Sequence, residues 1–320
     1  MNFKYILIVL GEPYSTFSEI IGKYYELNKY SKKKIILIGS MGLFNQQLKK
    51  LKYKLPLNKI SDIKYADKRK INIIDVEFKY IKTFTDISEK SNQYIKKCFE
   101  VALEILKKLK KKGILINGPI SKKFFLKKKF SGITEYLSQK TNSNNEVMLI
   151  YNKKISVSPL TTHIPIKFVA KSLTKTKIIN NVTKIHKFYK DIFNKNIKIA
   201  ILGLNPHCET IDKFSEEEEI IIPSLKILNK RGINIDGPFS ADTFFFDKNL
   251  SKYNVVIGMY HDQVLTPIKT LYNFEAINIT IGLPFIRISP DHGPNSEMLG
   301  KNKSDPTSLT YAIKFIENLK

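Results

Sequence analysis

Short apolar runs alternate with amphipathic stretches along almost the whole chain of 320 residues. An apolar run of about four to eight residues between turn residues predicts a buried strand, whereas apolar side chains that recur every three or four residues predict a helix. In the first half, this pattern predicts strands at residues 5–10, 34–39, 71–76 and 114–117. It predicts helices at residues 17–27, 42–51 and 87–111.

The second half of the chain continues this alternation. Strands are predicted at residues 147–151, 155–158, 197–204 and 255–260, and helices at residues 176–193, 216–231 and 306–319. Such a succession is typical of an α/β fold with a largely parallel, doubly wound sheet and helices on both faces. The length allows two domains, and the charged stretch 122–129 is the expected crossing between them.

The net charge of +25 does not by itself indicate a nucleic-acid partner. Lysine is spread through nearly every segment, and arginine, which makes forked contacts to bases and phosphates, occurs only as Arg69, Arg231 and Arg287. This distribution argues against nucleic acid and leaves attraction of an anionic substrate as a role for the charge. Two cysteines provide no disulfide framework. No apolar run reaches membrane-spanning length and no signal-peptide pattern is found, so we expect a cytoplasmic protein.

Three of the five histidines follow strand-like runs. They are His163 in Thr-Thr-His-Ile-Pro, His207 in Asn-Pro-His and His261 in Tyr-His-Asp-Gln. Loops at the carboxyl ends of strands in α/β folds converge on one ligand site. Three imidazoles that meet there would leave a coordination position of a divalent metal open, which is the arrangement of catalytic zinc. The alternative is that each histidine is only hydrogen-bonded locally.

A set of motifs in fixed order resembles the 4-hydroxythreonine-4-phosphate dehydrogenase family of vitamin B6 biosynthesis. The motifs are Asn117-Gly-Pro-Ile-Ser-Lys122, Gly132-Ile-Thr-Glu135, Thr161-Thr-His-Ile-Pro165, Gly203-Leu-Asn-Pro-His207, Asp236-Gly-Pro, Ala241-Asp-Thr243, Met259-Tyr-His-Asp-Gln263, Asn278-Ile-Thr-Ile-Gly-Leu-Pro-Phe-Ile-Arg287 and Asp291-His-Gly293. The resemblance implies two α/β/α domains with a cleft between them, as in isocitrate and isopropylmalate dehydrogenases, and a homodimer. It implies a cofactor-side domain of residues 1–128 plus 266–320, and a second domain, residues 129–265, that carries the metal ligands.

The resemblance also implies roles for individual residues. Metal ligands are expected at His163, His207 and His261, and substrate-binding residues at Thr134, Lys269, Asn278 and Arg287. Candidates for proton transfer or for orienting the ligands are Lys122, Asp242 and Asp262, and candidates for a cofactor loop are Asp291, His292 and Gly293. Lys269 and Arg287 suit a small anionic, phosphorylated substrate, which they would hold through charge-assisted hydrogen bonds.

The implied activity is a metal-assisted oxidation by NAD or NADP. Its substrate would be 4-phosphohydroxy-L-threonine, and the β-keto acid formed would lose carbon dioxide to give 3-amino-2-oxopropyl phosphate. Three imidazoles favour zinc over magnesium, with cobalt as a further possibility. No Gly-x-Gly-x-x-Gly follows the first strand, so the sequence does not distinguish NAD from NADP.

Three departures from the family pattern bear on the substrate. The usual Gly-Asp-Pro-Ala-Gly-Ile-Gly-Pro-Glu opening is replaced by a glycine-poor stretch at residues 11–19, and the glycine-rich loop after the second metal ligand by residues 208–212. Ile133 stands where the family has a substrate-contacting histidine. A dehydrogenase of a four-carbon sugar-acid phosphate, such as threonate or erythronate 4-phosphate, is therefore an alternative. A non-catalytic basic binding protein is a more remote one.

Overall fold

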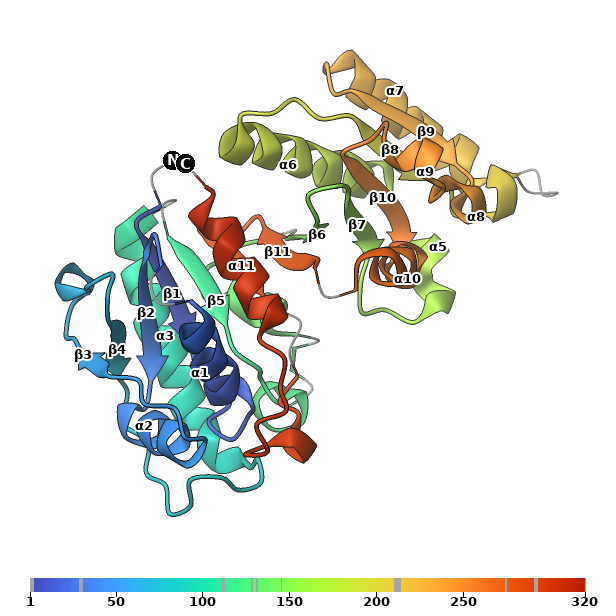
Figure 1. Ribbon diagram of the computed structural model, residues 1–320. Coiled ribbons are helices and arrows are strands. Elements are labelled where there is room, and N and C mark those ends of the chain that lie inside the picture. Colours follow the sequence, from blue (N-terminus) through green and yellow to red (C-terminus); the bar gives the residue numbers. More distant parts are fainter. Residues whose placement is uncertain are drawn as a thin grey trace. The chain divides into compact units, whose positions relative to one another are not determined.

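The computed structural model of the chain describes residues 3–28, 31–110, 113–127, 129–130, 132–144, 146–209, 214–273, 275–290 and 293–319. The chain divides into two compact units, shown in Figure 1. Unit 1 consists of Met1–Ser143 and Leu283–Lys320, and unit 2 of Asn144–Gly282. Unit 1 is therefore built from both ends of the chain, and unit 2 is inserted between them.

Unit 1 contains a parallel sheet with helices on both faces. In sheet order its strands are β3 (Leu57–Lys59), β4 (Ile71–Asp75), β2 (Lys34–Gly39), β1 (Tyr5–Val9), β5 (Ile114–Asn117) and β12 (Ile286–Ser289). Its helices include α1 (Phe17–Leu27), α2 (Met41–Lys50), α3 (Asn92–Leu109), α4 (Ile133–Lys140) and α11 (Thr307–Glu317). The strand order reverses between β1 and β5, and ligands of doubly wound sheets bind at such reversals.

The alternation of side chains along β1 explains why both faces of the unit 1 sheet are covered. Leu7 and Val9 pack with the apolar side of α3, including Cys98, in one core cluster. Ile6 and Ile8 point the other way and are equally buried. In Figure 1 the helices α1 and α11 lie on the opposite side of the sheet from α3. Cys98 is a free cysteine, buried on α3.

Unit 2 has a mixed sheet. In sheet order its strands are β11 (Ile277–Ile281), β6 (Val147–Tyr151), β7 (Ser156–Thr161), β10 (Val255–Tyr260), β8 (Ile199–Leu202) and β9 (Ile235–Phe239). Its helices include α5 (Val169–Ser172), α6 (Lys175–Phe193), α7 (Ile222–Lys230), α8 (Ala241–Phe244), α9 (Asp247–Leu250) and α10 (His261–Tyr272). Strand β6 runs antiparallel to both of its neighbours, whereas β7, β10, β8 and β9 run parallel. The predicted sheet is thus parallel in its larger part only.

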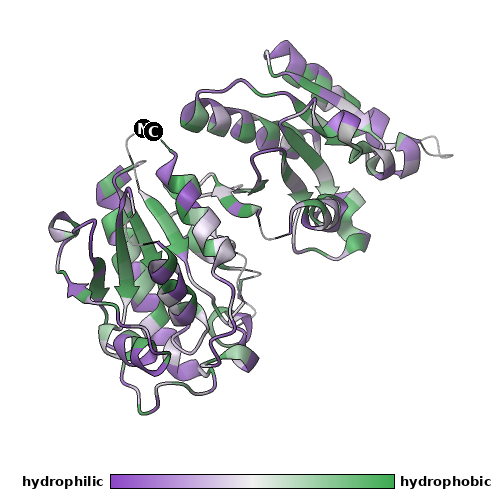
Figure 2. Cartoon of the chain, in the orientation of Figure 1, coloured by the Kyte–Doolittle hydropathy of each residue, from purple (hydrophilic) through white to green (hydrophobic). Residues whose placement is uncertain are grey.

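One core cluster of unit 2 lies between this sheet and α10. Val157, Ala200 and Val256 on the strands pack with Val264 and Ile268 of α10. Figure 2 shows the same division in both units, with apolar residues concentrated on the strands and hydrophilic residues along the helices. Within the described residues, none of the helices has the length and apolar character needed to cross a membrane.

The two crossings between the units lie later in the chain than residues 128/129 and 265/266, where the sequence placed them. They follow Ser143 and Gly282. The first is displaced because α4 places Tyr136 and Leu137 in the core of unit 1. The second is displaced because β11 pairs with β6 and therefore belongs to unit 2. Local charge could not reveal either of these long-range contacts.

The loop after β1 holds a buried carboxyl group, that of Glu12, which is 1% exposed. The loop is anchored where the Glu12 amide donates to the carbonyl of Pro119, at 2.8 Å. Gly11 has a φ of 73°, and a Cβ there would collide with that same carbonyl oxygen. Burial raises the pKa of Glu12 from 4.5 to about 7, and neither carboxyl oxygen has a hydrogen-bond partner among the described residues.

Glu12 is expected to make stability pH-dependent. Between pH 4.5 and about 7, the unfolded chain loses the Glu12 proton while the folded chain keeps it. The free energy of unfolding therefore falls as pH rises through this window, by up to about 3 kcal/mol. Glu12→Gln should remove this contribution, so its stability relative to the wild type should increase with pH. Urea denaturation from about pH 5 to about pH 8 measures this, with exposed Glu77→Gln as the control. A pH-independent difference would contradict the expectation.

Candidate functional site

The three histidines singled out in the sequence lie at the carboxyl ends of three adjacent parallel strands of unit 2. His163 follows β7, His261 is the first residue of α10 directly after β10, and His207 lies in the turn Pro206–Cys208 after β8. Strand β10 pairs with β7 on one side and with β8 on the other. The sheet topology therefore brings all three imidazoles to one edge of unit 2.

The rings of His163 and His261 are close, with centroids 6.2 Å apart. The Nδ1 atom of His261 is 2.7 Å from Oδ1 of Asp262, and His207 Nδ1 is 3.8 Å from Oδ2 of Asp242. The hydrogen bond from Ser240, with a smaller contribution from His207, lowers the pKa of Asp242. Among the residues that the structure describes, no group of three or more His, Cys, Asp or Glu side chains is arranged so that it could hold a metal ion. The three histidines thus lie at the same edge of the sheet, but their side chains do not converge on one point where a metal would bind.

Hydrogen bonds join the three strand ends to one another. Thr161 Oγ1 at the end of β7 donates to the carbonyl of Met259 on β10, at 2.7 Å. The Gln263 side chain accepts from the Met259 amide at 2.7 Å and donates to the carbonyl of Gly203, after β8, at 2.8 Å. These bonds fix the spacing of the backbone segments that carry His163, His207 and His261.

Unit 1 contains a buried guanidinium group, that of Arg287. Arg287, on β12, is 2% exposed; its Nε donates to Asn117 Oδ1 at 2.8 Å and its Nη1 to Thr134 Oγ1 at 2.7 Å. Burial lowers the pKa of Arg287 to about 10, and the nearby Glu135 carboxylate acts to raise it again. The group is therefore a cation at neutral pH. The structure thus brings two predicted substrate-binding residues, Thr134 and Arg287, into direct contact.

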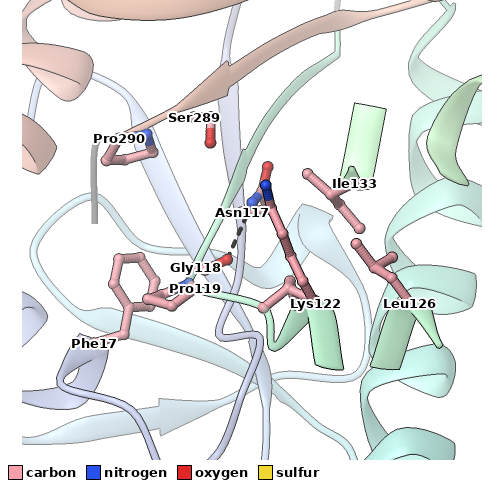
Figure 3. Close-up of a pocket in the computed structure, with 10 residues that line it drawn as sticks. Phe17, Asn117, Gly118, Pro119, Lys122, Leu126, Ile133, Ser289 and Pro290 are labelled. Carbon is pink, nitrogen blue, oxygen red and sulfur yellow. Dashed lines mark hydrogen bonds between the residues drawn. The ribbon is translucent and has the colours of Figure 1, made fainter. Parts of the chain in front are cut away.

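A pocket of about 110 Å³ opens beside this cluster at the carboxyl ends of β5 and β12, next to the start of α1. Its lining consists of Phe17, Asn117, Gly118, Pro119, Ile120, Lys122, Leu126, Ile133, Ser289 and Pro290. In Figure 3, Leu126 and Ile133 lie on one side of Lys122, and Phe17, Ser289 and Pro290 on the other. Asn117 links the pocket to Arg287. A cationic side chain and an apolar wall thus share one small cavity.

Two further predicted substrate-binding residues lie in unit 2, and the predicted cofactor loop lies in unit 1. Asn278 lies on β11 and Lys269 on α10, both in unit 2. The Oδ1 atom of Asn278 is shielded from solvent and receives no hydrogen bond from any described residue. Gly293 is exposed, and Asp291 and His292 lie outside the described residues.

Three polar residues that organise these clusters were not predicted as site residues. They are Asn117, Gln263 and Glu217. Asn117 and Gln263 stand within the recognised motifs, so the motifs alone could have suggested them. Glu217 stands in a run of four glutamates, and nothing in the sequence separates it from the other three.

The two units have the fold of the decarboxylating dehydrogenases. The β-decarboxylating dehydrogenase of Thermococcus kodakarensis superimposes with a TM-score of 0.51 over 98% of this chain and 83% of that chain, at 10% identity. A likeness at this identity concerns the fold alone. It agrees with the isocitrate/isopropylmalate dehydrogenase type of fold that the sequence implied.

The family assignment is more specific. The profile of the pyridoxal phosphate biosynthetic protein PdxA matches residues 31–316. The 4-hydroxythreonine-4-phosphate dehydrogenase of Sulfurihydrogenibium sp. (strain YO3AOP1) is 36% identical over 98% of both chains. The crystal structure of the enzyme of that name from Klebsiella pneumoniae has a TM-score of 0.86 and 25% identity, covering 97% of this chain and 98% of that one. This chain belongs to the PdxA family.

Family membership confirms three predictions from the sequence: the resemblance, the α/β fold class and the enzyme class. The chain is an oxidoreductase of the dehydrogenase type in pyridoxal phosphate biosynthesis. The alternative of a non-catalytic basic binding protein is thereby set aside.

Proposed function

We propose that this dehydrogenase oxidises 4-phosphohydroxy-L-threonine with NAD or NADP, assisted by a divalent metal held by His163, His207 and His261. The β-keto acid formed would lose carbon dioxide to give 3-amino-2-oxopropyl phosphate. The observation that carries the proposal is the placement of the three imidazoles at adjacent parallel strand ends of unit 2. The relatives named for this reaction provide the substrate.

The donor chemistry of the histidines fits a zinc-like metal. Neutral imidazole is a preferred ligand of zinc and cobalt, and a carboxylate on the other ring nitrogen commonly orients such a ligand. Asp262 stands in this relation to His261, because its contact with Nδ1 leaves Nε2 available. When bound, the metal would polarise the substrate hydroxyl as a Lewis acid, and the nicotinamide would accept the hydride.

The residues of unit 1 fit the anionic part of the substrate. Asn117 and Thr134 hold the guanidinium of Arg287 in a fixed plane, so little ordering is needed when an anion binds. Lys122 adds a second cation at the adjoining pocket, where it would bind the substrate or transfer a proton. In unit 2, Lys269 on α10 and Asn278 on β11 are the further proposed substrate contacts.

Ile133 favours the alternative substrate class. It places an apolar wall beside Lys122 where the family has an imidazole. A lost hydrogen bond to a buried polar group costs about 1–3 kcal/mol when nothing replaces it. A four-carbon sugar-acid phosphate lacks the amino group, so threonate or erythronate 4-phosphate is the second candidate. A cytoplasmic homodimer is part of the proposal through the family resemblance.

The test is nicotinamide reduction, followed by absorbance with zinc- or cobalt-loaded protein. It compares 4-phosphohydroxy-L-threonine with threonate 4-phosphate and erythronate 4-phosphate, each with NAD and with NADP. We expect turnover with the amino acid. Turnover only with a sugar acid would move the chain to the second candidate, and silence with all three substrates would contradict both.

The variant Ile133→His sharpens this test, because it restores the family residue in the pocket. We expect it to retain activity and to lower KM for the amino acid by up to about 10-fold, as one regained hydrogen bond would. Ile133→Leu is the matched control with the same polarity. A large loss of activity in Ile133→His alone would show that the pocket has been rebuilt around isoleucine.

A further inference from the structure

The loop that carries His207, residues 203–209, has an unfavourable backbone. His207 and Cys208 have φ angles of 55° and 60°. Left-handed conformations of non-glycine residues cost roughly 1 kcal/mol or more each, and persist only where the surroundings hold them. Two turn hydrogen bonds lie within the loop, from Cys208 to Asn205 and from Glu209 to Pro206. Something outside the loop must therefore hold its entry fixed.

Glu217 supplies that anchor from the start of the π-helical turn Glu217–Ile221, which precedes α7. Its side chain is 1% exposed. Oε1 accepts the backbone N–H groups of Leu204 and Asn205 at 2.6 and 2.9 Å, and Oε2 accepts Asn205 Nδ2 and Ser215 Oγ at 2.8 and 2.9 Å. Each oxygen thus accepts two hydrogen bonds, and two of the donors are consecutive backbone amides just before His207.

The carboxylate of Glu217 is ionised at neutral pH. Burial acts to raise its pKa, but the hydrogen bonds from Asn205 and Ser215 outweigh burial, so the pKa lies below its ordinary value. Hydrogen bonds to a charged acceptor are about twice as strong as neutral ones. The bonds from the Leu204 and Asn205 amides therefore fix the peptide planes at the entry to the loop, and the bonds from the Asn205 and Ser215 side chains hold the carboxylate in place.

Hydrogen bonds also connect the anchored segment to the segment that carries His261. The carbonyl of Gly203, directly before Leu204, accepts the bond from Gln263, whose side chain also accepts from the amide of Met259, two residues before His261. One hydrogen-bond network thus holds the backbone near both His207 and His261. Glu217 provides the bonds of this network on the His207 side.

We propose that Glu217 is a positioning residue, which holds the loop of His207 in the conformation required for metal binding. The inference rests on the proposed metal site and adds to it a residue that never contacts the metal. The other three glutamates of the run differ from it. Glu216 accepts a hydrogen bond from the side chain of Asn205 and none from a backbone amide of the described residues 203–209, while Glu218 and Glu219 are exposed.

The experiment is a titration of the full-length chain with Co²⁺, read from its visible absorption and by competition with a chelator. Loss of residues that support metal ligands typically weakens binding about 10- to 100-fold. We expect about 100-fold weaker Co²⁺ binding in Glu217→Ala, and about 10-fold in Glu217→Gln, which keeps one acceptor oxygen. The absorption spectrum at saturation should also change, since it reports ligand geometry. A variant that only loses stability would keep the wild-type spectrum.

Glu218→Ala is the matched control, because it removes the same charge one residue away without touching the loop. It should bind Co²⁺ within about 2-fold of the wild type. Wild-type affinity in Glu217→Ala, or an equal loss in Glu218→Ala, would overturn the positioning role. If Glu217→Ala does not fold, unchanged affinity in Glu217→Gln has the same consequence. If wild type binds no Co²⁺, or His207→Ala binds it equally well, the proposed metal site fails instead.

Discussion

Alanine at His163, His207 or His261 is expected to lower kcat/KM by roughly a thousand-fold or more, because each change removes a proposed metal ligand. The three residues follow β7, β8 and β10; His163 and His207 are exposed, and His261 is only partly buried. The variants should therefore fold like the wild type. The measurements are nicotinamide reduction and metal content after dialysis, with circular dichroism as the check on folding.

His186→Ala is the control for these variants, since His186 lies on α6, away from the strand ends in the sequence. It should retain wild-type turnover and metal content. Full turnover in any one of the three site variants would remove that histidine from the ligand set. Loss of activity with full metal content would assign that histidine to the chemistry instead of to metal binding.

Replacement of Arg287 by methionine is expected to affect both stability and activity. The change removes the donors to Asn117 and Thr134 and leaves the nearby Glu135 without this cation. The two acceptors would lose hydrogen bonds to a charged donor, and such bonds contribute about 1.5–3 kcal/mol each. Loss of the charge-assisted contact to an anionic substrate should also raise KM at least about 10-fold. Urea denaturation and steady-state kinetics measure the two effects separately.

The double variant Arg287→Met, Glu135→Gln separates the two roles of Arg287. The Glu135→Gln change removes the carboxylate charge that Arg287→Met leaves without a nearby cation. The double variant should therefore recover most of the lost stability while KM stays high. Recovery of both would mean that Arg287 serves only the fold. An unchanged KM in the stable double variant would remove Arg287 from substrate binding.

Local sequence pattern predicted some elements closely and others poorly. Helix α1 and strands β2 and β5 have the predicted bounds, because each is a periodic or apolar stretch with clear turns at its ends. The long helix predicted at residues 87–111 begins only at Asn92. The antiparallel direction of β6 was not predicted, because direction depends on which distant strand it pairs with.

The same distinction applies to the site. The histidines were recognised because each follows its own strand, and Arg287 because its motif matches a substrate-binding position of the family. The role of Glu217 depends on how a helical turn meets a loop after β8, which no local pattern encodes. The sequence predicted only that the acidic run begins a helix, whereas Glu217 itself binds the preceding loop.

The insertion of unit 2 between the two parts of unit 1 has a consequence for synthesis on the ribosome. Strand β5 leaves the ribosome long before β12, its partner in the sheet. At about 5–20 residues per second, translating the intervening unit takes on the order of ten seconds. For that time β5 has an open edge, and open edges pair readily with other chains. Unit 2 can complete first, which makes nascent unit 1 the part of this protein most dependent on chaperones.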